Sequence, residues 1–168
     1  RVDTTVDRPH RHVIDQGQAS CTNCAAGKYG AGTGKITETS ACNYCQVGKY
    51  NDQPGQASCI DCLEGKYTTE AGQASCSDCS MGKYKSQKGQ GVCIDCVMGK
   101  YGDKQGQASC KDCAAGKYSD QKGIGQESDC KNCDSGTTSA AGSDAASDCL
   151  GPCAAGKYGQ PGTCHMVA

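Results

Sequence analysis

The chain has 168 residues, 17 of which are cysteine, and its formal net charge is −1. Phe and Trp are absent and Leu, Ile and Val are scarce, so the composition excludes an ordinary hydrophobic core and is typical of a disulfide scaffold. The balanced charge gives no field to attract nucleic acid or an anionic membrane, and no apolar run approaches the roughly 18 residues that a membrane span needs. Disulfides in place of a core indicate an oxidising compartment, so we expect a secreted, extracellular or cell-surface protein.

Residues 1–20 are predicted to be a degenerate leader, an N-terminal arm that ends like a repeat but lacks its opening cysteine. Residues 17–21, GQASC, match residues 55–59, but the position that would hold the partner of Cys21 is Asp7. Cys21 is therefore expected to be unpaired or to join another chain.

Residues 21–164 form one tandem repeat. Its clearest copies, between Cys59 and Cys113, follow the pattern C-x-D-C-x-x-G-K-Y-x-x-x-x-G-Q-x-x, which returns every 17 residues. Such a period predicts a linear array of stacked modules, because no unit of this size can bury a core alone. The repeats divide into the loops 24–42, 45–59, 62–76, 79–93, 96–110, 113–130, 133–149 and 153–164. Residues 165–168 are a C-terminal tail.

Each loop is expected to hold one short strand at Gly-Lys-Tyr and a turn with a return strand before the next cysteine. Helix is disfavoured because glycine recurs too often. The predicted fold class is small and disulfide-rich. It is an elongated tandem array of short two-stranded cysteine-rich repeats, with little regular secondary structure and almost no helix.

The spacing of the cysteines predicts one disulfide for each loop. Residues three apart in an extended backbone point to opposite faces, so the second cysteine of each C-x-x-C closes the loop that follows it. The predicted pairs are Cys24–Cys42, Cys45–Cys59, Cys62–Cys76, Cys79–Cys93, Cys96–Cys110, Cys113–Cys130, Cys133–Cys149 and Cys153–Cys164. A nested pairing, first to third and second to fourth, remains open because the sequence does not fix connectivity.

The segment from Cys45 through Gly48-Lys49-Tyr50 to Cys59 resembles the first disulfide loop of tumour necrosis factor receptor cysteine-rich domains. More broadly, residues 13–164 are similar to the cysteine-rich repeats of ephrin-receptor type, which recur in large surface proteins. In the receptor domains this loop closes on the next cysteine, so the resemblance implies the same pairing. The chain departs from those receptors by repeating a single loop type, whereas they mix loop types and set two crossed disulfides in each domain.

Seven tyrosines follow Gly-Lys and are expected to pack over the neighbouring disulfide. A ligand-binding aromatic strip is the alternative. These tyrosines are Tyr29, Tyr50, Tyr67, Tyr84, Tyr101, Tyr118 and Tyr158.

An Asp or Asn precedes the second cysteine of most pairs, and an Asx-turn is the expected role. A calcium site is the alternative, although one carboxylate per 17 residues is sparse for it. The lysines of Gly-Lys-Tyr are expected to form a solvated row, with weak ladders to the aspartates as the alternative.

The chain is not expected to be an enzyme or to hold a cofactor or metal. Histidine occurs only at positions 10, 12 and 165, so no Ser/His/Asp or Cys/His constellation can be placed. Zinc-ribbon spacing is usually longer than the gaps between these cysteine pairs, and a thioredoxin-like C-x-x-C needs a βαβ context.

The leading hypothesis for function is an extracellular structural protein, a disulfide-laddered rod that assembles into a filament, surface hair or coat. Its partners would be further copies of itself or other surface proteins. Loops 62–76, 79–93 and 96–110 are almost interchangeable, which favours a strut over a unique binding surface. The alternative is a receptor-like extracellular protein-binding module that uses its longer loops, 31–41, 119–129 and 134–148, for recognition.

Overall fold

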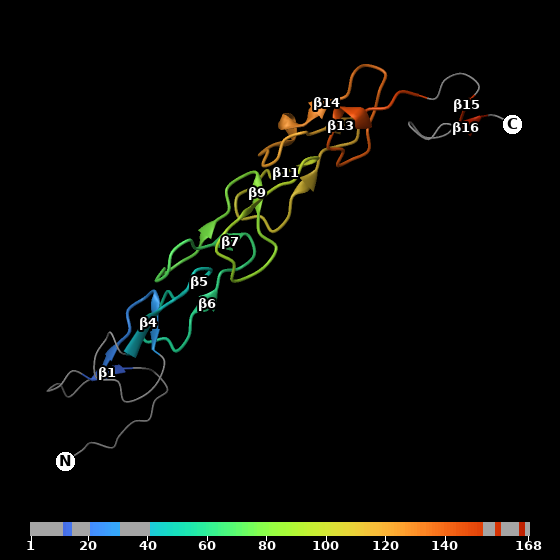
Figure 1. Ribbon diagram of the computed structural model, residues 1–168. Helices are drawn as coiled ribbons and strands as arrows, with labels where there is room; N and C mark the ends of the chain where they lie inside the picture. Colours follow the sequence, from blue (N-terminus) through green and yellow to red (C-terminus); the bar gives the residue numbers. More distant parts are fainter. Residues whose placement is uncertain (1–11, 15–20, 31–40, 153–156, 159–164, 167–168) are drawn as a thin grey trace, which may run out of the picture. The chain divides into compact units, whose positions relative to one another are not determined.

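The computed structural model describes residues 12–14, 21–30, 41–152, 157–158 and 165–166 (Figure 1). The chain divides into two compact units. The first comprises Arg1–Ser77 and Gln87–Val92, and the second comprises Asp78–Ser86 and Cys93–Ala168. Each unit is built from the same kind of disulfide-closed loop.

The strands are two or three residues long. In chain order they are β1 (His12–Ile14), β2 (Cys21–Asn23), β3 (Lys28–Gly30), β4 (Cys42–Tyr44), β5 (Lys49–Tyr50), β6 (Ile60–Asp61), β7 (Lys66–Tyr67), β8 (Ser77–Asp78), β9 (Lys83–Tyr84), β10 (Ile94–Asp95), β11 (Lys100–Tyr101), β12 (Lys111–Asp112), β13 (Lys117–Tyr118), β14 (Lys131–Asn132), β15 (Lys157–Tyr158) and β16 (His165–Met166). Two 3-10 helices, η1 (Glu127–Asp129) and η2 (Ala146–Asp148), lie in the last two described loops.

Successive strands pair into two-stranded sheets, β1 with β2, β3 with β4, and so on to β15 with β16. The Lys-Tyr pair of one loop lies antiparallel to the two residues that separate the next two cysteines. Lys49 is opposite Asp61, for example, and Tyr50 is opposite Ile60. The predicted fold class, a small disulfide-rich array of two-stranded tandem repeats with little regular secondary structure, is therefore confirmed.

Seven disulfides close the described loops. They join Cys24 to Cys42, Cys45 to Cys59, Cys62 to Cys76, Cys79 to Cys93, Cys96 to Cys110, Cys113 to Cys130 and Cys133 to Cys149. These pairs coincide with those expected from strand geometry, and none of them is nested. The predicted pair Cys153–Cys164 lies outside the described residues, as do most of the leader and tail. Cys21 lies in β2, and its side chain is also outside the description.

The cystines themselves form the interior of each unit. The second cysteine of each C-x-x-C, from Cys24 to Cys113, is completely buried. Ile60, Leu63 and Val97, in contrast, are about half exposed. In the second unit Tyr101 and Ile124 pack with Cys113 and Cys130 into one buried cluster. Cystine sulfur, with a few side chains such as Tyr101 and Ile124, thus replaces the hydrophobic core that the composition cannot supply.

Successive loops are joined by a recurring main-chain hydrogen bond. The turn glycine of one loop donates its N–H to the carbonyl of the buried cysteine that opens the preceding loop. In the first unit the donors Gly55, Gly72 and Gly89 bind the oxygens of Cys24, Cys45 and Cys62 at 2.8, 2.8 and 3.0 Å. In the second unit Gly106, Gly123 and Gly142 bind those of Cys79, Cys96 and Cys113 at 2.8, 2.8 and 2.9 Å.

A second contact buries the residue that follows each tyrosine. Asn51, Thr68, Lys85 and Ser119 occupy this position, and Ser139 occupies the equivalent position after Thr138; all five are buried, although they are polar. The carbonyls of Asn51, Thr68, Ser119 and Ser139 accept hydrogen bonds from the Gly-Lys-Tyr glycine of the preceding loop, as in the 2.7 Å bond from the Gly27 N–H to the Asn51 oxygen. The side chain of Asn51 also donates to the carbonyl of Lys28 at 2.8 Å.

The Gly-Lys-Tyr glycines approach the main chain two loops further along. Gly48 has φ +81°, and a Cβ there would overlap the carbonyl oxygen of Gly89 and lie 2.5 Å from its carbonyl carbon. In the second unit, a Cβ on Gly99 would overlap the oxygen of Gly142 in the same way. Glycine is needed here both for the positive φ and for the close approach.

Candidate functional site

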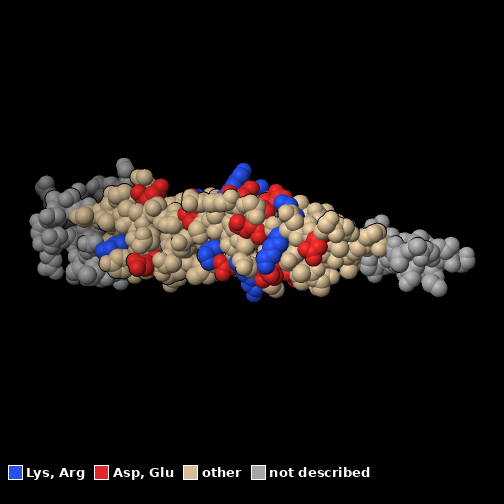
Figure 2. All heavy atoms as spheres, turned by 90° about the horizontal axis from the view of Figure 1, so that it is seen from above, with Lys and Arg blue, Asp and Glu red and all other residues tan. Residues whose placement is uncertain are grey.

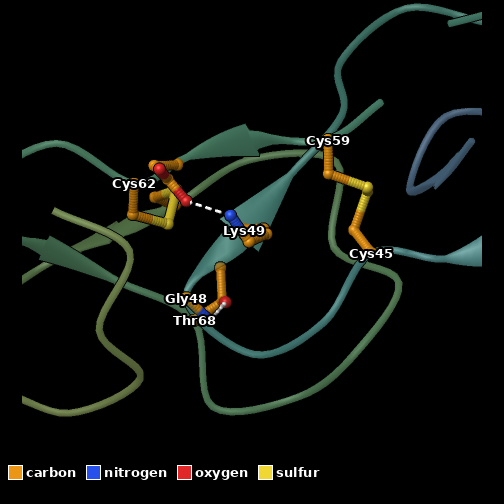
Figure 3. A network of polar contacts seen from close by, with 8 residues as sticks. Cys45, Gly48, Lys49, Cys59, Cys62 and Thr68 are labelled. Carbon is orange, nitrogen blue, oxygen red and sulfur yellow. Dashed lines mark hydrogen bonds and ion pairs between the residues drawn. A yellow bond between two sulfur atoms is a disulfide. The ribbon is translucent and has the colours of Figure 1, made fainter. Parts of the chain in front are cut away.

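The lysines of Gly-Lys-Tyr form ion pairs with the aspartates of the cysteine pairs. The strand register places them directly opposite each other, and Lys49 pairs with Asp61, Lys83 with Asp95 and Lys100 with Asp112. Figure 3 shows Lys49 and the dashed line of its ion pair, between the two disulfides that flank this hairpin. The sequence favoured a solvated row and an Asx-turn for these residues. The hydrogen bonds described for these carboxylates go to lysine instead, because the hairpin brings the two positions together.

Each ion pair is partly exposed, with 40% of the Lys49 side chain and 48% of the Asp61 side chain accessible. Surface pairs of this kind contribute little to stability. They do neutralise the row of lysines. Figure 2 shows lysine side chains lying among Asp and Glu side chains on the face in view.

Two further ion pairs lie beside tyrosines of the second unit. Lys111 donates to Asp103 and Lys131 donates to Asp120, both at 2.7 Å. These hydrogen bonds hold the pKa of Asp103 and of Asp120 below the usual value and raise the pKa of Lys111 and Lys131. The shifts favour the charged forms and move each pKa further from neutral pH. A group that transfers protons near neutral pH needs a pKa close to about 7.

The repeat tyrosines are more exposed than a core aromatic would be. Tyr101 is buried at 9% exposure, against Cys113 of the next loop. The others described, Tyr29, Tyr50, Tyr67, Tyr84 and Tyr118, are all half-buried. Tyr158 lies in β15, and its side chain is outside the description. Most of these rings therefore keep a face or an edge accessible to solvent.

Two tyrosines each line a small hollow made from equivalent positions of the repeat. One, of about 260 Å³, lies in the first unit and is lined by Tyr29, Gln46, Lys49, Ser58 and Cys59. The other, of about 240 Å³, lies in the second unit and is lined by Tyr84, Val97, Lys100, Ser109 and Cys110. In both, the tyrosine comes from one loop and the other residues come from the next. The sequence showed that Tyr, Lys and Ser recur at fixed positions. It did not show that they line a common hollow.

The longer loops of the second unit are anchored rather than free. Ile124 of loop 119–129 is buried, and its carbonyl accepts a 3.0 Å hydrogen bond from Gly102. Asp129 and Asp148 cap η1 and η2 by accepting main-chain N–H bonds, at 3.0 Å from Gln126 in the first case. Residues 31–40 of the third longer loop lie outside the described residues. In the part of the chain that is described, no group of three His, Cys, Asp or Glu side chains is arranged to hold a metal ion.

Disulfide-closed hairpins repeated in tandem around a cystine interior define a cysteine-rich repeat protein of extracellular type. The family model described as "Tyrosine-protein kinase ephrin type A/B receptor-like" matches the chain three times, at residues 32–75, 65–106 and 86–130. These matches together span more than half of the chain, so it belongs to this ephrin receptor-like family of cysteine-rich repeats. A comparison with curated proteins found no match. The likeness to tumour necrosis factor receptor domains stays a prediction.

The family and the disulfides both indicate an extracellular or cell-surface location. Among the described residues there is no helix with the length and apolar character to cross a membrane.

Proposed function

We propose that the protein is a non-enzymatic structural protein of the cell exterior, a disulfide-laddered rod that assembles into a filament, surface hair or coat. The observation that carries this proposal is the hydrogen bond from turn glycine to cysteine carbonyl, which recurs between successive loops three times in each unit. Because it joins main chain to main chain, it does not depend on the side chains at the variable positions. An array held in this way can be extended by adding loops.

The near identity of loops 62–76, 79–93 and 96–110 supports the same proposal. A strut benefits from equal loops that make equal contacts. The proposed partner is a second copy of the chain, and Cys21 is the proposed covalent joint.

Electron microscopy of the purified full chain over a concentration series tests the assembly. Filaments or sheets with a regular repeat are expected, together with a dimer band on a non-reducing gel that Cys21→Ser removes. Single particles of one size at every concentration, with no dimer band, would contradict the assembly. Cys21→Ser in parallel separates assembly through the disulfide from assembly through other contacts.

A receptor-like binding module is the second candidate, and membership of an ephrin receptor-like family is the observation that favours it. The longer loops 119–129 and 134–148 would then carry recognition, held in place by their 3-10 helices. Replacing residues 134–148 with the shorter loop 97–109 tests this candidate. Loss of saturable binding to cell surfaces after the exchange would favour recognition, and unchanged assembly in the same variant would favour the structural role.

A further inference from the structure

The two tyrosine hollows suggest a binding function that does not depend on assembly. They lie in different units, yet each is made by the tyrosine of one loop and by the lysine, serine and closing cysteine of the next. The same positions recur because the repeat places equivalent residues in equivalent surroundings, so the two hollows can be compared directly. The hollows are smaller than the roughly 300–1,000 Å³ of sites for drug-sized ligands, so each can take about one small ring.

The walls of each hollow combine an aromatic ring with hydrogen-bonding groups of both kinds. Tyr29 provides a half-buried ring, and the Ser58 hydroxyl can both donate and accept. Lys49 lines the same hollow, and its ammonium group is paired with Asp61, which is not itself a lining residue. In the second hollow Tyr84, Ser109 and the pair of Lys100 with Asp112 repeat this set.

This combination suits a ligand with one apolar face and several hydroxyl groups at its edge. A pyranose ring is such a ligand, since its C–H face can lie on an aromatic ring while its hydroxyls both donate and accept. A polyanion fits less well because the lysine in each hollow is already neutralised by an aspartate. A proline-rich peptide fits less well because it offers carbonyl acceptors but few donors for the serine oxygen.

We propose that the tyrosine hollows bind sugar units of a neutral polysaccharide, one ring in each hollow. The first hollow has Gln46 where the second has Val97, and the amide offers the sugar one more hydrogen bond. The hollow at Tyr29 should therefore bind more tightly than the hollow at Tyr84.

The test uses the full chain with isotope-labelled tyrosine, and NMR follows each ring while cellohexaose is added to about 10 mM. That concentration is about tenfold above a millimolar dissociation constant, which corresponds to only modest binding energy. The resonances of Tyr29 and Tyr84 are expected to shift in a saturable way. Ser58→Phe should abolish the shift of Tyr29 alone, and Ser109→Phe that of Tyr84 alone, because each places a ring in one hollow from an exposed position.

Ser86→Phe is the matched control, because Ser86 is also exposed but lines neither hollow, and it should leave both shifts unchanged. Val97→Gln should strengthen binding at Tyr84 about fivefold, the worth of one added hydrogen bond. The proposal is overturned if neither tyrosine shifts with cellohexaose, or if a decaproline peptide or a sulfated hexasaccharide shifts them and cellohexaose does not. None of these results depends on whether the chain forms filaments.

Discussion

Substituting alanine for Gly48 tests whether loops two repeats apart are held in contact. Gly48 has φ +81°, and an added Cβ would overlap the Gly89 oxygen and lie 2.5 Å from the Gly89 carbon and 3.0 Å from the Gln90 carbon. All three neighbouring atoms belong to main chain, which cannot rotate away as a side chain can. Alanine at this position should therefore push Gly89 and Gln90 away from Gly48.

The cost can be divided into two parts with a second glycine as the control. Gly136 occupies the same position in its own loop and has φ +83°, but a Cβ there would meet nothing within 4 Å. Gly136→Ala should therefore cost only the left-handed backbone strain, about 1–2 kcal/mol. Gly48→Ala adds a main-chain overlap, for which about 1–3 kcal/mol is typical of overpacking. The expected total for Gly48→Ala is about 2–5 kcal/mol.

Hydrogen exchange is the suitable assay, because an array of loops can open locally without unfolding as a whole. The Gly89 N–H, which donates to the Cys62 carbonyl at 3.0 Å, should lose much of its protection in Gly48→Ala. Gly136→Ala should leave it protected. Equal protection of Gly89 in both variants would refute the contact between these loops.

Three further outcomes are expected. Removing one disulfide, by Cys62→Ser together with Cys76→Ser, should lower stability by about 3 kcal/mol. Hydrogen exchange in loop 62–76 measures this loss, and unchanged exchange would contradict the role of cystines as the interior. Thr68→Val should expose the Gly48 N–H to about fivefold faster exchange, because it removes the Oγ1 acceptor at 2.7 Å. The hydrogen bond from Lys111 lowers the pKa of Asp103 in the folded protein below its unfolded value near 3.8. The stabilisation that this bond gives the fold is therefore present above pH 3.8 and is lost as the pH falls through the folded pKa. The ring resonance of Tyr101, beside Lys111, should report that loss, and Asp103→Asn should abolish it while Asp120→Asn does not.

The buried polar residues explain why the array tolerates variation at the position after tyrosine. Asn51, Thr68 and Lys85 differ in size and charge, yet all are buried at that point. The constant element is the main-chain carbonyl, which accepts the N–H of the preceding glycine in the Asn51 and Thr68 contacts. The side chains add bonds of their own, as when the Thr68 Oγ1 accepts from the Gly48 N–H at 2.7 Å.

The sequence by itself predicted the hairpins and favoured the observed cysteine partners over a nested pairing, because both depend on residues less than twenty positions apart. Gly48-Lys49-Tyr50 specifies its own turn and strand, and the spacing from Cys45 to Cys59 leaves one short loop to close. The tertiary structure favoured the pairing of Lys49 with Asp61 over a solvated lysine row, and it alone decided the burial of Thr68 and the contact of Gly48 with Gly89. Each of these requires a register or a stacking of loops, and a local pattern contains no information on which loop will lie beneath another. The tyrosine hollows follow from the same stacking, since no single loop encloses them.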